Sequence, residues 1–412
     1  MSRADADAAA AAAARFAPAF DAARVSHVAA RRRRGDAALR ILRPQDFAAA
    51  RAEISAWPGH APTPLLELPA LAADLRLGRL LYKDEGPRFG LGSFKALGGA
   101  YAALRLLQRQ ASPAPGREAS AREIRSGALA ERVAAITLVS ATDGNHGRSL
   151  AWGCRRFGAR CRIFIHAGVS EARAEAMRAL GARVTRIAGD YDASVEAARR
   201  EAEANGWFVV SDTSWPGCSA PPRDVMAGYG VMTGEIVAAM DAPPSHVFVQ
   251  GGVGGLAASV AAALRQSWGD RAPRMVVVEP ETAACLFESA RRGRPASVPI
   301  ARETCMAGLS CGEPSPMAWE ILAEEASDFL AISDDLVAPT VRLLARPRGA
   351  DPAIAAGESG AAGLAALIAA ARRPALRAAL GLDAASSVLL IGSEGVTDSA
   401  IYEAMLAGAS DA

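Results

Sequence analysis

The sequence has few of the residues from which metal sites, disulfide frameworks and aromatic surfaces are built. Its 412 residues include five histidines and six cysteines, and no two cysteines form a CxxC pair. Ligands scattered in this way match none of the common zinc-site patterns, so we expect no metal. Aromatic residues make up only 5% of the chain. Free buried thiols are the simplest interpretation of the cysteines.

The chain also lacks an excess of charge of either sign and has no long apolar run. With 46 basic and 44 acidic residues the formal net charge is +2, so no overall field favours nucleic acid or a membrane surface. No apolar run approaches the roughly 18 residues that span a bilayer, and no charged-then-apolar leader opens the sequence. We therefore expect a cytoplasmic protein whose partners are small molecules.

Length and composition fit two domains with a shared interface, because 51% of the residues are hydrophobic and 22% are charged. The first segment is different. Residues 1–34 are rich in Ala and Arg, with an Ala run at 8–14 and an Arg tract at 31–34. We interpret them as a mobile or helical tail rather than a nucleic-acid arm, within a predicted extension that covers residues 1–48.

From residue 133 onward, short apolar runs alternate with Ala-rich, charged segments of helical length. This alternation predicts an α/β fold in which helices cover mostly parallel sheets, with functional loops beyond the carboxyl ends of the strands. The expected strands are 133–139, 161–165, 183–187, 207–210, 246–250, 275–279 and 387–392. The expected helices between them include 147–158, 170–181, 192–206 and 256–264.

One lysine lies where no other residue nearby is charged. Lys95 follows Phe94 and precedes an apolar, Gly-rich segment in the stretch 82–101. An ε-amine in an apolar pocket has a depressed pKa and reacts with aldehydes to form a Schiff base. The alternative is a lysine whose charged end reaches solvent from a buried helix start.

The loop SATDGNHG, residues 140–147, joins an expected strand to an expected helix. Its small residues and the helix N-terminus form a surface suited to a carboxylate. The Asn145 amide suits a ring hydroxyl, and the carboxylate of Asp143 indicates proton transfer or recognition of a second, cationic group. A Ser/Asp/Asn helix cap accounts for only part of this cluster. The candidate substrate contacts are Ser140, Thr142, Asp143, Gly144 and His146, although His146 is more simply part of the loop structure.

A second loop, QGGVGGLA at residues 250–257, also leads into an expected helix. Backbone N–H groups of such a turn bind phosphate, although no Gly-Lys-Ser/Thr follows as in a P-loop. The pattern GxGxxA, with Glu279 at the end of the next strand, keeps an NAD-linked oxidoreductase as an alternative. A phosphorylated aldehyde cofactor explains more, because it accounts for Lys95 and Asn145 as well. Its phosphate ligands would be Gly251, Gly252, Val253, Gly254 and Gly255.

SFKALGG, SATDGNHG and QGGVGG, in this order, resemble the pyridoxal-phosphate enzymes of the tryptophan-synthase β type, called fold type II. Five stretches together narrow the resemblance to the diaminopropionate ammonia-lyases. They are RFGLGSFKALGGAYA (88–102), ATDGNHGR (141–148), DTSW (212–215), AGLSCGEPSPMAWEIL (307–322) and SEGVTD (393–398).

The resemblance implies two three-layer αβα domains with pyridoxal phosphate between them, and a homodimer. A small domain of residues 105–222 would be inserted in a large domain of residues 49–104 and 223–412. The implied reaction is the elimination of ammonia from 2,3-diaminopropionate, which gives pyruvate and two molecules of ammonia.

The resemblance also implies roles for single residues. Lys95 would bond the cofactor aldehyde and act as base, and Asp143 and Asp212 would handle the β-ammonium or a proton. Ser393 would meet the pyridine nitrogen, and Asn145 the ring hydroxyl. The loop that contains Cys311 would lie at the active site, where a disulfide with Cys285 is the alternative to free thiols.

Departures from the lyase pattern leave other functions open. Ser93 before Phe94 and Lys95 is typical of a serine or threonine dehydratase, and a catalytically silent protein that binds pyridoxal phosphate or an amino acid is a further alternative. Two other residues are interpreted as structural: Glu358 as a carboxylate at a helix start, and Trp319 as a core residue.

Overall fold

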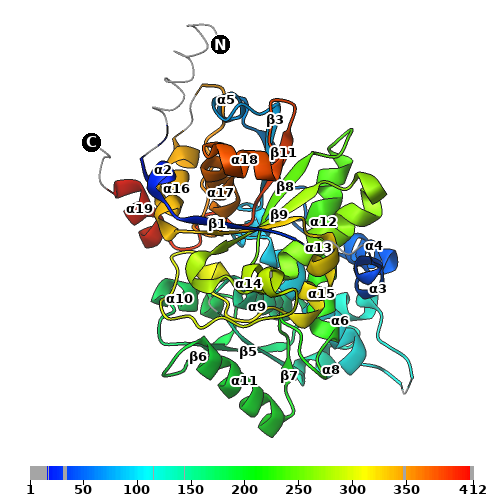
Figure 1. Cartoon of the computed structure of the whole chain (residues 1–412). Coiled ribbons are helices and arrows are strands. Elements are labelled where there is room, and N and C mark those ends of the chain that lie inside the picture. Colours follow the sequence, from blue (N-terminus) through cyan, green and yellow to red (C-terminus); the bar gives the residue numbers. More distant parts are fainter. Residues whose placement is uncertain are drawn as a thin grey trace, which may run out of the picture.

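The computed structural model describes residues 16, 18–30, 35–114, 116–142, 144–346 and 349–408. Two sheets organise these residues, a larger one in the upper part of Figure 1 and a smaller one at the bottom. The larger sheet has seven strands in the order β1-β10-β9-β8-β11-β3-β2, and the smaller has four in the order β6-β5-β4-β7. The predicted α/β class is confirmed.

The larger sheet is parallel in its interior, and its two edge strands run antiparallel to their neighbours. Inner strands such as β8 are buried along their whole length, because a parallel sheet is covered on both faces. The strands are β1 Val25–Ala29, β2 Leu65–Glu67, β3 Arg79–Asp84, β8 His246–Gln250, β9 Arg274–Pro280, β10 Asp328–Ile332 and β11 Ser387–Gly392.

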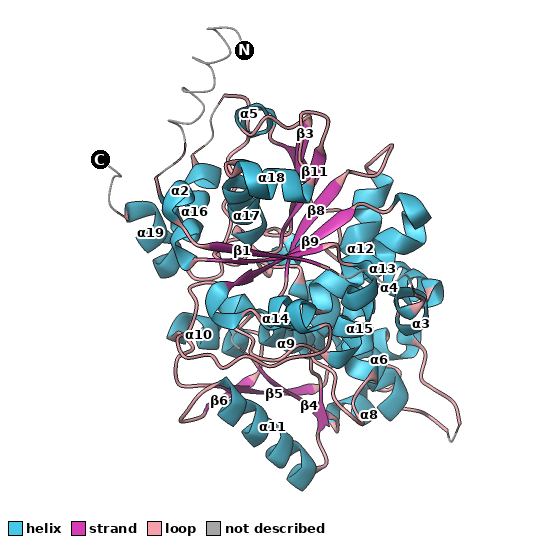
Figure 2. Ribbon diagram, viewed as in Figure 1, coloured by secondary structure: helices cyan, strands magenta, loops and turns pink. Residues whose placement is uncertain are grey.

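Helices cover both faces of this sheet, as Figure 2 shows. Successive strand residues point to opposite faces, so Phe248 of β8 packs in the core that contains α17, and Val247 and Val249 pack in the core that contains α13. The helices are α2 Ala19–Ala22, α3 Ala37–Ile41, α4 Pro44–Ser55, α5 Pro69–Asp74, α6 Lys95–Gln110, α12 Ala220–Ala238, α13 Gly255–Trp268, α14 Cys285–Arg292, α15 Pro316–Glu325, α16 Val337–Ala345, α17 Ala362–Ala371, α18 Pro374–Leu380 and α19 Ser399–Ala407. Short 3-10 helices are η1 Arg88–Gly90, η2 Gly269–Arg271, η3 Glu281–Ala283, η4 Ala307–Leu309 and η5 Asp334–Leu336.

The smaller sheet is entirely parallel, and α11 lies on its outer face in Figure 1. Its elements are α7 Ala121–Arg125, α8 Ala130–Ala134, β4 Thr137–Ala141, α9 Asn145–Phe157, β5 Arg160–Ile165, α10 Glu171–Ala179, β6 Arg183–Arg186, α11 Tyr191–Asn205 and β7 Phe208–Val209. Gly158 and Gly206 end α9 and α11 in the left-handed conformation, with φ of 89° and 66°. The first predicted strand was placed too early, because residues 130–134 form α8.

The N-terminal segment departs from its interpretation as a tail. β1 pairs antiparallel with β10 at the edge of the larger sheet, and Phe20 of α2 is 1% exposed. Two Val residues and buried Phe side chains hold residues 18–30 on the body of the protein. These few apolar residues did not stand out in the sequence because the segment is rich in Ala and Arg. The tracts at 8–14 and 31–34 lie outside the described residues.

Other expectations can be compared with the described part of the chain. Trp319 packs in the core against Phe329, at a ring distance of 6.2 Å, which confirms the structural interpretation. No helix there is long and apolar enough to cross a bilayer. Strands β4 to β7 all fall within 105–222, but α6 crosses the proposed boundary at residue 104, and the division into domains stays a prediction.

Candidate active site

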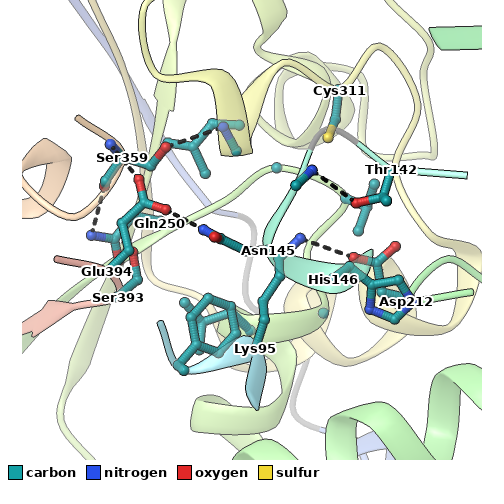
Figure 3. A pocket seen from close by; sticks show the side chains of 18 of the residues that line it. Lys95, Thr142, Asn145, His146, Asp212, Gln250, Cys311, Ser359, Ser393 and Glu394 are labelled. Atoms are coloured by element: carbon teal, nitrogen blue, oxygen red, sulfur yellow. Dashed lines mark hydrogen bonds and ion pairs between the residues drawn. The ribbon is translucent and has the colours of Figure 1, made fainter. Parts of the chain in front are cut away.

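The loops that follow β4 and β8 face each other across one pocket (Figure 3). The pocket, together with the solvent-open space at its mouth, has a volume of about 960 Å³. Loops from both sheets therefore meet where parallel strands end. The predicted site residues that line it are Lys95, Thr142, Gly144, Asn145, His146, Asp212, Gly251, Gly252, Val253, Gly255 and Ser393.

Lys95 is the first residue of α6, and its side chain enters this pocket. The backbone N–H of Lys95 donates to Ser93 Oγ at 3.1 Å, so the Ser93 hydroxyl stabilises the start of the helix. Lys95 Nζ lies 3.1 Å from Asp212 Oδ2, and the two side chains are 21% and 16% exposed. The apolar setting seen in the sequence thus contains a partly buried carboxylate that comes from 117 residues further along the chain.

This carboxylate reverses the expected direction of the lysine's pKa. Burial opposes the ammonium charge, but the neighbouring groups, of which Asp212 is the foremost, together outweigh it and raise the pKa of Lys95. The same pair lowers the pKa of Asp212 to about 2 against the opposing effect of burial. Without a cofactor, Lys95 is therefore an ammonium held by Asp212, and the depressed pKa predicted from the apolar sequence is wrong.

His146, the second residue of α9, is buried beside this pair. Its Nε2 donates to the carbonyl oxygen of Val210 at 3.0 Å, and its Nδ1 has no hydrogen-bond partner among the described residues. Burial lowers the pKa of His146, with Lys95 adding to the effect and Asp212 opposing it. A neutral imidazole with a free Nδ1 lone pair results.

The loop between β4 and α9 is folded around Thr142. Its Oγ1 accepts hydrogen bonds from the backbone N–H groups of Gly144 and Gly147, at 3.1 and 3.3 Å. Asp143 lies outside the described residues. Ser140 does not line the pocket: its hydroxyl donates to the carbonyl oxygen of Ala141 at 3.3 Å, and the residue borders a neighbouring cavity.

Asn145 meets a residue that the sequence interpretation missed. Its amide nitrogen donates to Glu394, which follows Ser393 and is 5% exposed. The other oxygen of Glu394 accepts the backbone N–H of Ser359 at 3.0 Å. The only signal in the sequence was the place of Glu394 inside SEGVTD, next to a predicted site residue.

The glycine loop after β8 presents backbone to the pocket. Gly252 and Gly254 have φ of +62° and +97°, which residues with a Cβ rarely adopt. The first N–H groups of α13 have no acceptor within the helix and carry the positive end of its dipole. Gln250 at the end of β8 donates to the carbonyl oxygens of Ser359 and Ile391, at 3.1 and 2.8 Å, which fixes the base of the loop.

Two sequence alternatives fail at this loop. Glu279, the expected ribose ligand, is fully buried and accepts the backbone N–H groups of Leu286 and Phe287 at 3.0 and 2.7 Å. It therefore orders the start of α14, and burial raises its pKa to about 8. None of the six cysteines is part of a disulfide, so no such bond joins Cys285 to the pocket residue Cys311.

Further pocket residues had no clear sequence signal. Tyr229 of α12 packs edge-on against Phe94 at a ring distance of 4.6 Å, and its buried hydroxyl has no hydrogen-bond partner in the ranges that the structure describes. Arg173 of α10 forms an ion pair with Glu358, which lies in the turn before α17. Burial and the nearby Glu394 raise the pKa of Glu358 to about 7. Glu358 thus connects the turn before α17 to α10 through this ion pair, a contact that its interpretation as a helix-start carboxylate did not include.

The residues present fit a phosphorylated pyridoxal. A primary amine lies in the pocket opposite a glycine loop at a helix N-terminus, which is the arrangement that an aldehyde and a phosphate on one small molecule require. Within the described part of the chain, three buried polar atoms of lining residues lack a hydrogen-bond partner: Tyr229 Oη, His146 Nδ1 and Gln250 Oε1. Such atoms are rare in folded proteins and are commonly satisfied by a ligand or water.

Comparison with known proteins agrees with this chemistry. The family model described as pyridoxal-phosphate dependent enzyme matches residues 56–394, and the chain belongs to this family. The predicted cofactor, pyridoxal phosphate, is thereby confirmed. The NAD-linked alternative is excluded with it.

The similarity is strong for one group within the family. The chain is 38% identical over 346 residues to the diaminopropionate ammonia-lyase of Escherichia coli strain K12, across 82% of this chain and 86% of that enzyme. The crystal structure of the E. coli enzyme in complex with D-serine matches with a TM-score of 0.86 and 32% identity, over 96% of this chain and 99% of that chain. Its complex with an aminoacrylate-PLP azomethine reaction intermediate gives a TM-score of 0.85 at 32% identity, over 95% and 99%. The chain thus belongs with the diaminopropionate ammonia-lyases, as the sequence motifs predicted.

Proposed function

We propose that the chain removes ammonia from 2,3-diaminopropionate by α,β-elimination. The proton leaves Cα, the β-amine leaves Cβ with a proton, and the resulting 2-aminoacrylate hydrolyses to pyruvate and a second ammonia. The observation that carries the proposal is the partly buried pair of Lys95 and Asp212, at 3.1 Å, in a pocket that also presents a glycine loop. Similarity to the lyases supports it.

Bound pyridoxal phosphate withdraws electrons from Cα of an amino acid. The chain supplies the binding and the proton transfers. Lys95 would bond the cofactor aldehyde, and its amine would act as the base for a Cα proton. The N–H groups of Gly252, Val253 and Gly255 would bind the phosphate, Asn145 the ring oxygen and Ser393 the pyridine nitrogen. The N–H groups of the other two predicted ligands, Gly251 and Gly254, donate instead to the carbonyl oxygens of Val278 and Gly251, at 2.8 and 3.2 Å, and shape the loop.

Carboxylates suit the second amino group of this substrate. A β-ammonium within a few ångströms of a carboxylate gains roughly 2 to 4 kcal/mol at an effective dielectric constant near 20. Asp212 lies in the pocket, and Asp143 belongs to the loop that lines it. We propose that they hold the β-ammonium, with Thr142, Gly144 and His146 beside the substrate. Ser140 is left out of the substrate contacts because it borders the neighbouring cavity.

The dehydratase alternative rested on Ser93. The structure gives that hydroxyl a local role, because it accepts the backbone N–H of Lys95 and does not line the pocket. A substrate hydroxyl also carries no cation for Asp212 to attract. Elimination of water from serine is therefore the second candidate.

A coupled assay of pyruvate or 2-oxobutyrate release tests this choice. We expect a higher kcat/KM for 2,3-diaminopropionate than for serine or threonine, measured with both enantiomers. Asp143→Asn should lower kcat/KM for the diamine by roughly 30-fold or more and change turnover of serine far less, since only the diamine has a β-ammonium. A wild-type protein that prefers serine or threonine would make the dehydratase the function.

We also propose that the chain acts as a cytoplasmic homodimer built from the domains predicted above. The soluble, nearly neutral composition supports the location, and the similarity to fold type II enzymes supports the assembly. Light scattering at several concentrations measures the mass directly.

A further inference from the structure

The proposed chemistry leaves one buried charge of the pocket without a role. Glu394 lines the pocket, is 5% exposed and comes directly after Ser393. A carboxylate in such a place costs folding energy unless it is fully hydrogen-bonded. Its two oxygens accept from the side-chain amide of Asn145 and from the backbone N–H of Ser359.

The chemistry of this contact fixes the direction of the Asn145 amide. An ionised carboxylate only accepts hydrogen bonds, whereas an asparagine amide has a donor end and an acceptor end. The nitrogen of Asn145 must therefore face Glu394. That nitrogen carries two hydrogens, and the contact with Glu394 uses one of them. The second N–H stays available to a ligand in the pocket.

Glu394 is itself held from behind. Ser359, which donates to it, has its carbonyl oxygen bound by Gln250 Nε2 at 3.1 Å and its hydroxyl bound by the N–H of Gly308 at 3.2 Å. These bonds tie the carboxylate to the end of β8 and to η4. Arg148 and Arg173 lie close enough for their charges to act in the cluster of Glu394 and Glu358. The carboxylate is thus a rigid acceptor.

We propose that Glu394 is a positioning residue, which turns the Asn145 amide so that its free N–H binds the ring oxygen of the cofactor. The inference rests on the proposed placement of pyridoxal phosphate in this pocket and is independent of the substrate. Asn145 approaches from α9 beside the smaller sheet, and Glu394 follows β11 of the larger sheet. The contact between Asn145 and Glu394 therefore joins the two sides of the pocket at the amide that would bind the ring oxygen.

Glu394→Gln tests the inference with almost no change of volume. A glutamine can present either end of its amide, so the direction of Asn145 is no longer fixed. We expect the Kd of pyridoxal phosphate to rise by about tenfold or more, measured by titrating cofactor-depleted protein and following visible absorbance. The visible band should also lose intensity relative to the near-ultraviolet band, because a hydrogen bond to the ring oxygen stabilises its anionic form.

Asp398→Asn is the matched control. Asp398 also joins the two sides of the molecule, because it accepts the Ser170 hydroxyl at 2.8 Å, but it does not line the pocket. We expect the Kd of pyridoxal phosphate for this variant to stay within about threefold of the wild-type value. An equal loss in both variants would mean that Glu394 only holds the structure together.

Two double variants separate positioning from structure. In an Asn145→Ala background, Glu394→Gln should have no further effect on the Kd, since Glu394 acts through Asn145. Asn145→Asp combined with Glu394→Gln exchanges donor and acceptor, so it should recover thermal stability without recovering affinity. Recovery of affinity would overturn the proposal, and so would a Glu394→Gln protein with wild-type Kd and spectrum. A wild-type chain that binds no pyridoxal phosphate would instead contradict the proposed function.

Discussion

The pocket is built from two loops that occupy equivalent positions, one after β4 and one after β8, yet they present different chemistry. The loop at residues 251–255 offers backbone, with two glycines at positive φ and the N-terminus of α13. The loop at residues 140–147 offers side chains, and the partners of Asn145 and His146 are Glu394 and Val210. A backbone site is complete within its own loop, whereas a side-chain site depends on residues that the fold brings from elsewhere.

If both loops bind one ligand that is bonded to Lys95, then Lys95→Ala should have the largest effect of the variants considered. We expect the visible absorbance of the bound cofactor to disappear and elimination to fall by ~10³-fold or more, since both attachment and base are lost.

Borohydride treatment of the wild type supplies an internal control, because Lys83 and Lys95 are the two lysines of the sequence. Lys83 Nζ donates to Thr63 and Glu235, each at 2.7 Å, and is 1% exposed. The reduced adduct should map to the Lys95 peptide. An adduct on Lys83, or none, would contradict the assignment.

Gly254→Ala tests the backbone loop and should have an intermediate effect. A Cβ there would lie 3.1 Å from Ala318 Cβ, in a conformation with φ of +97°. We expect pyridoxal phosphate affinity to fall by about tenfold and the free energy of unfolding by about 1 to 2 kcal/mol, as measured by titration and denaturant unfolding. Gly158→Ala is the control, because its φ is +89° and its Cβ would meet nothing within 4 Å. Equal affinity losses in both variants would count against a phosphate role for the loop.

His146→Gln tests the side-chain loop and should have the smallest effect. Burial lowers the pKa of His146 from its usual 6.5, so the folded protein binds this proton less readily than the unfolded chain does. The stability that the neutral imidazole contributes is present above pH 6.5 and is lost as the pH falls below it. Between pH 7 and pH 5, the free energy of unfolding of the cofactor-free variant should fall less than that of wild type. Parallel pH profiles would show that His146 is accessible and charged in the folded state.

Much of the fold could be predicted from the sequence because short apolar runs are typical of buried parallel strands. The predictions for 246–250 and 387–392 match β8 and β11 residue for residue. β1 was missed, since five residues at a sheet edge carry too few apolar side chains to stand out beside Ala and Arg. Its strand character comes from pairing with β10, whose residues lie 299 to 307 positions further along the sequence (Ala29 to Asp328 and Val25 to Ile332).

The site divides in the same way. Lys95, Asn145 and the glycines were visible because their residue types are unusual where they occur. Glu394 and Tyr229 were not, because a glutamate in a loop and a tyrosine in a helix are ordinary until their surroundings are known. Glu279 shows the converse error. An acid at the end of a strand fitted a dinucleotide-binding pattern, yet its carboxylate accepts the first backbone N–H groups of α14.

The sequence by itself determined the α/β architecture, the cofactor class and the positions of the two loops, because periodicity, glycine and an isolated lysine are local properties of the chain. Only the tertiary structure decided the charge of Lys95 and the direction of the Asn145 amide. Both depend on a single carboxylate, Asp212 in one case and Glu394 in the other, brought within hydrogen-bonding distance from over 100 residues away. A hydrogen bond needs its two heavy atoms within about 3.2 Å of each other, and no local pattern in the sequence encodes that distance.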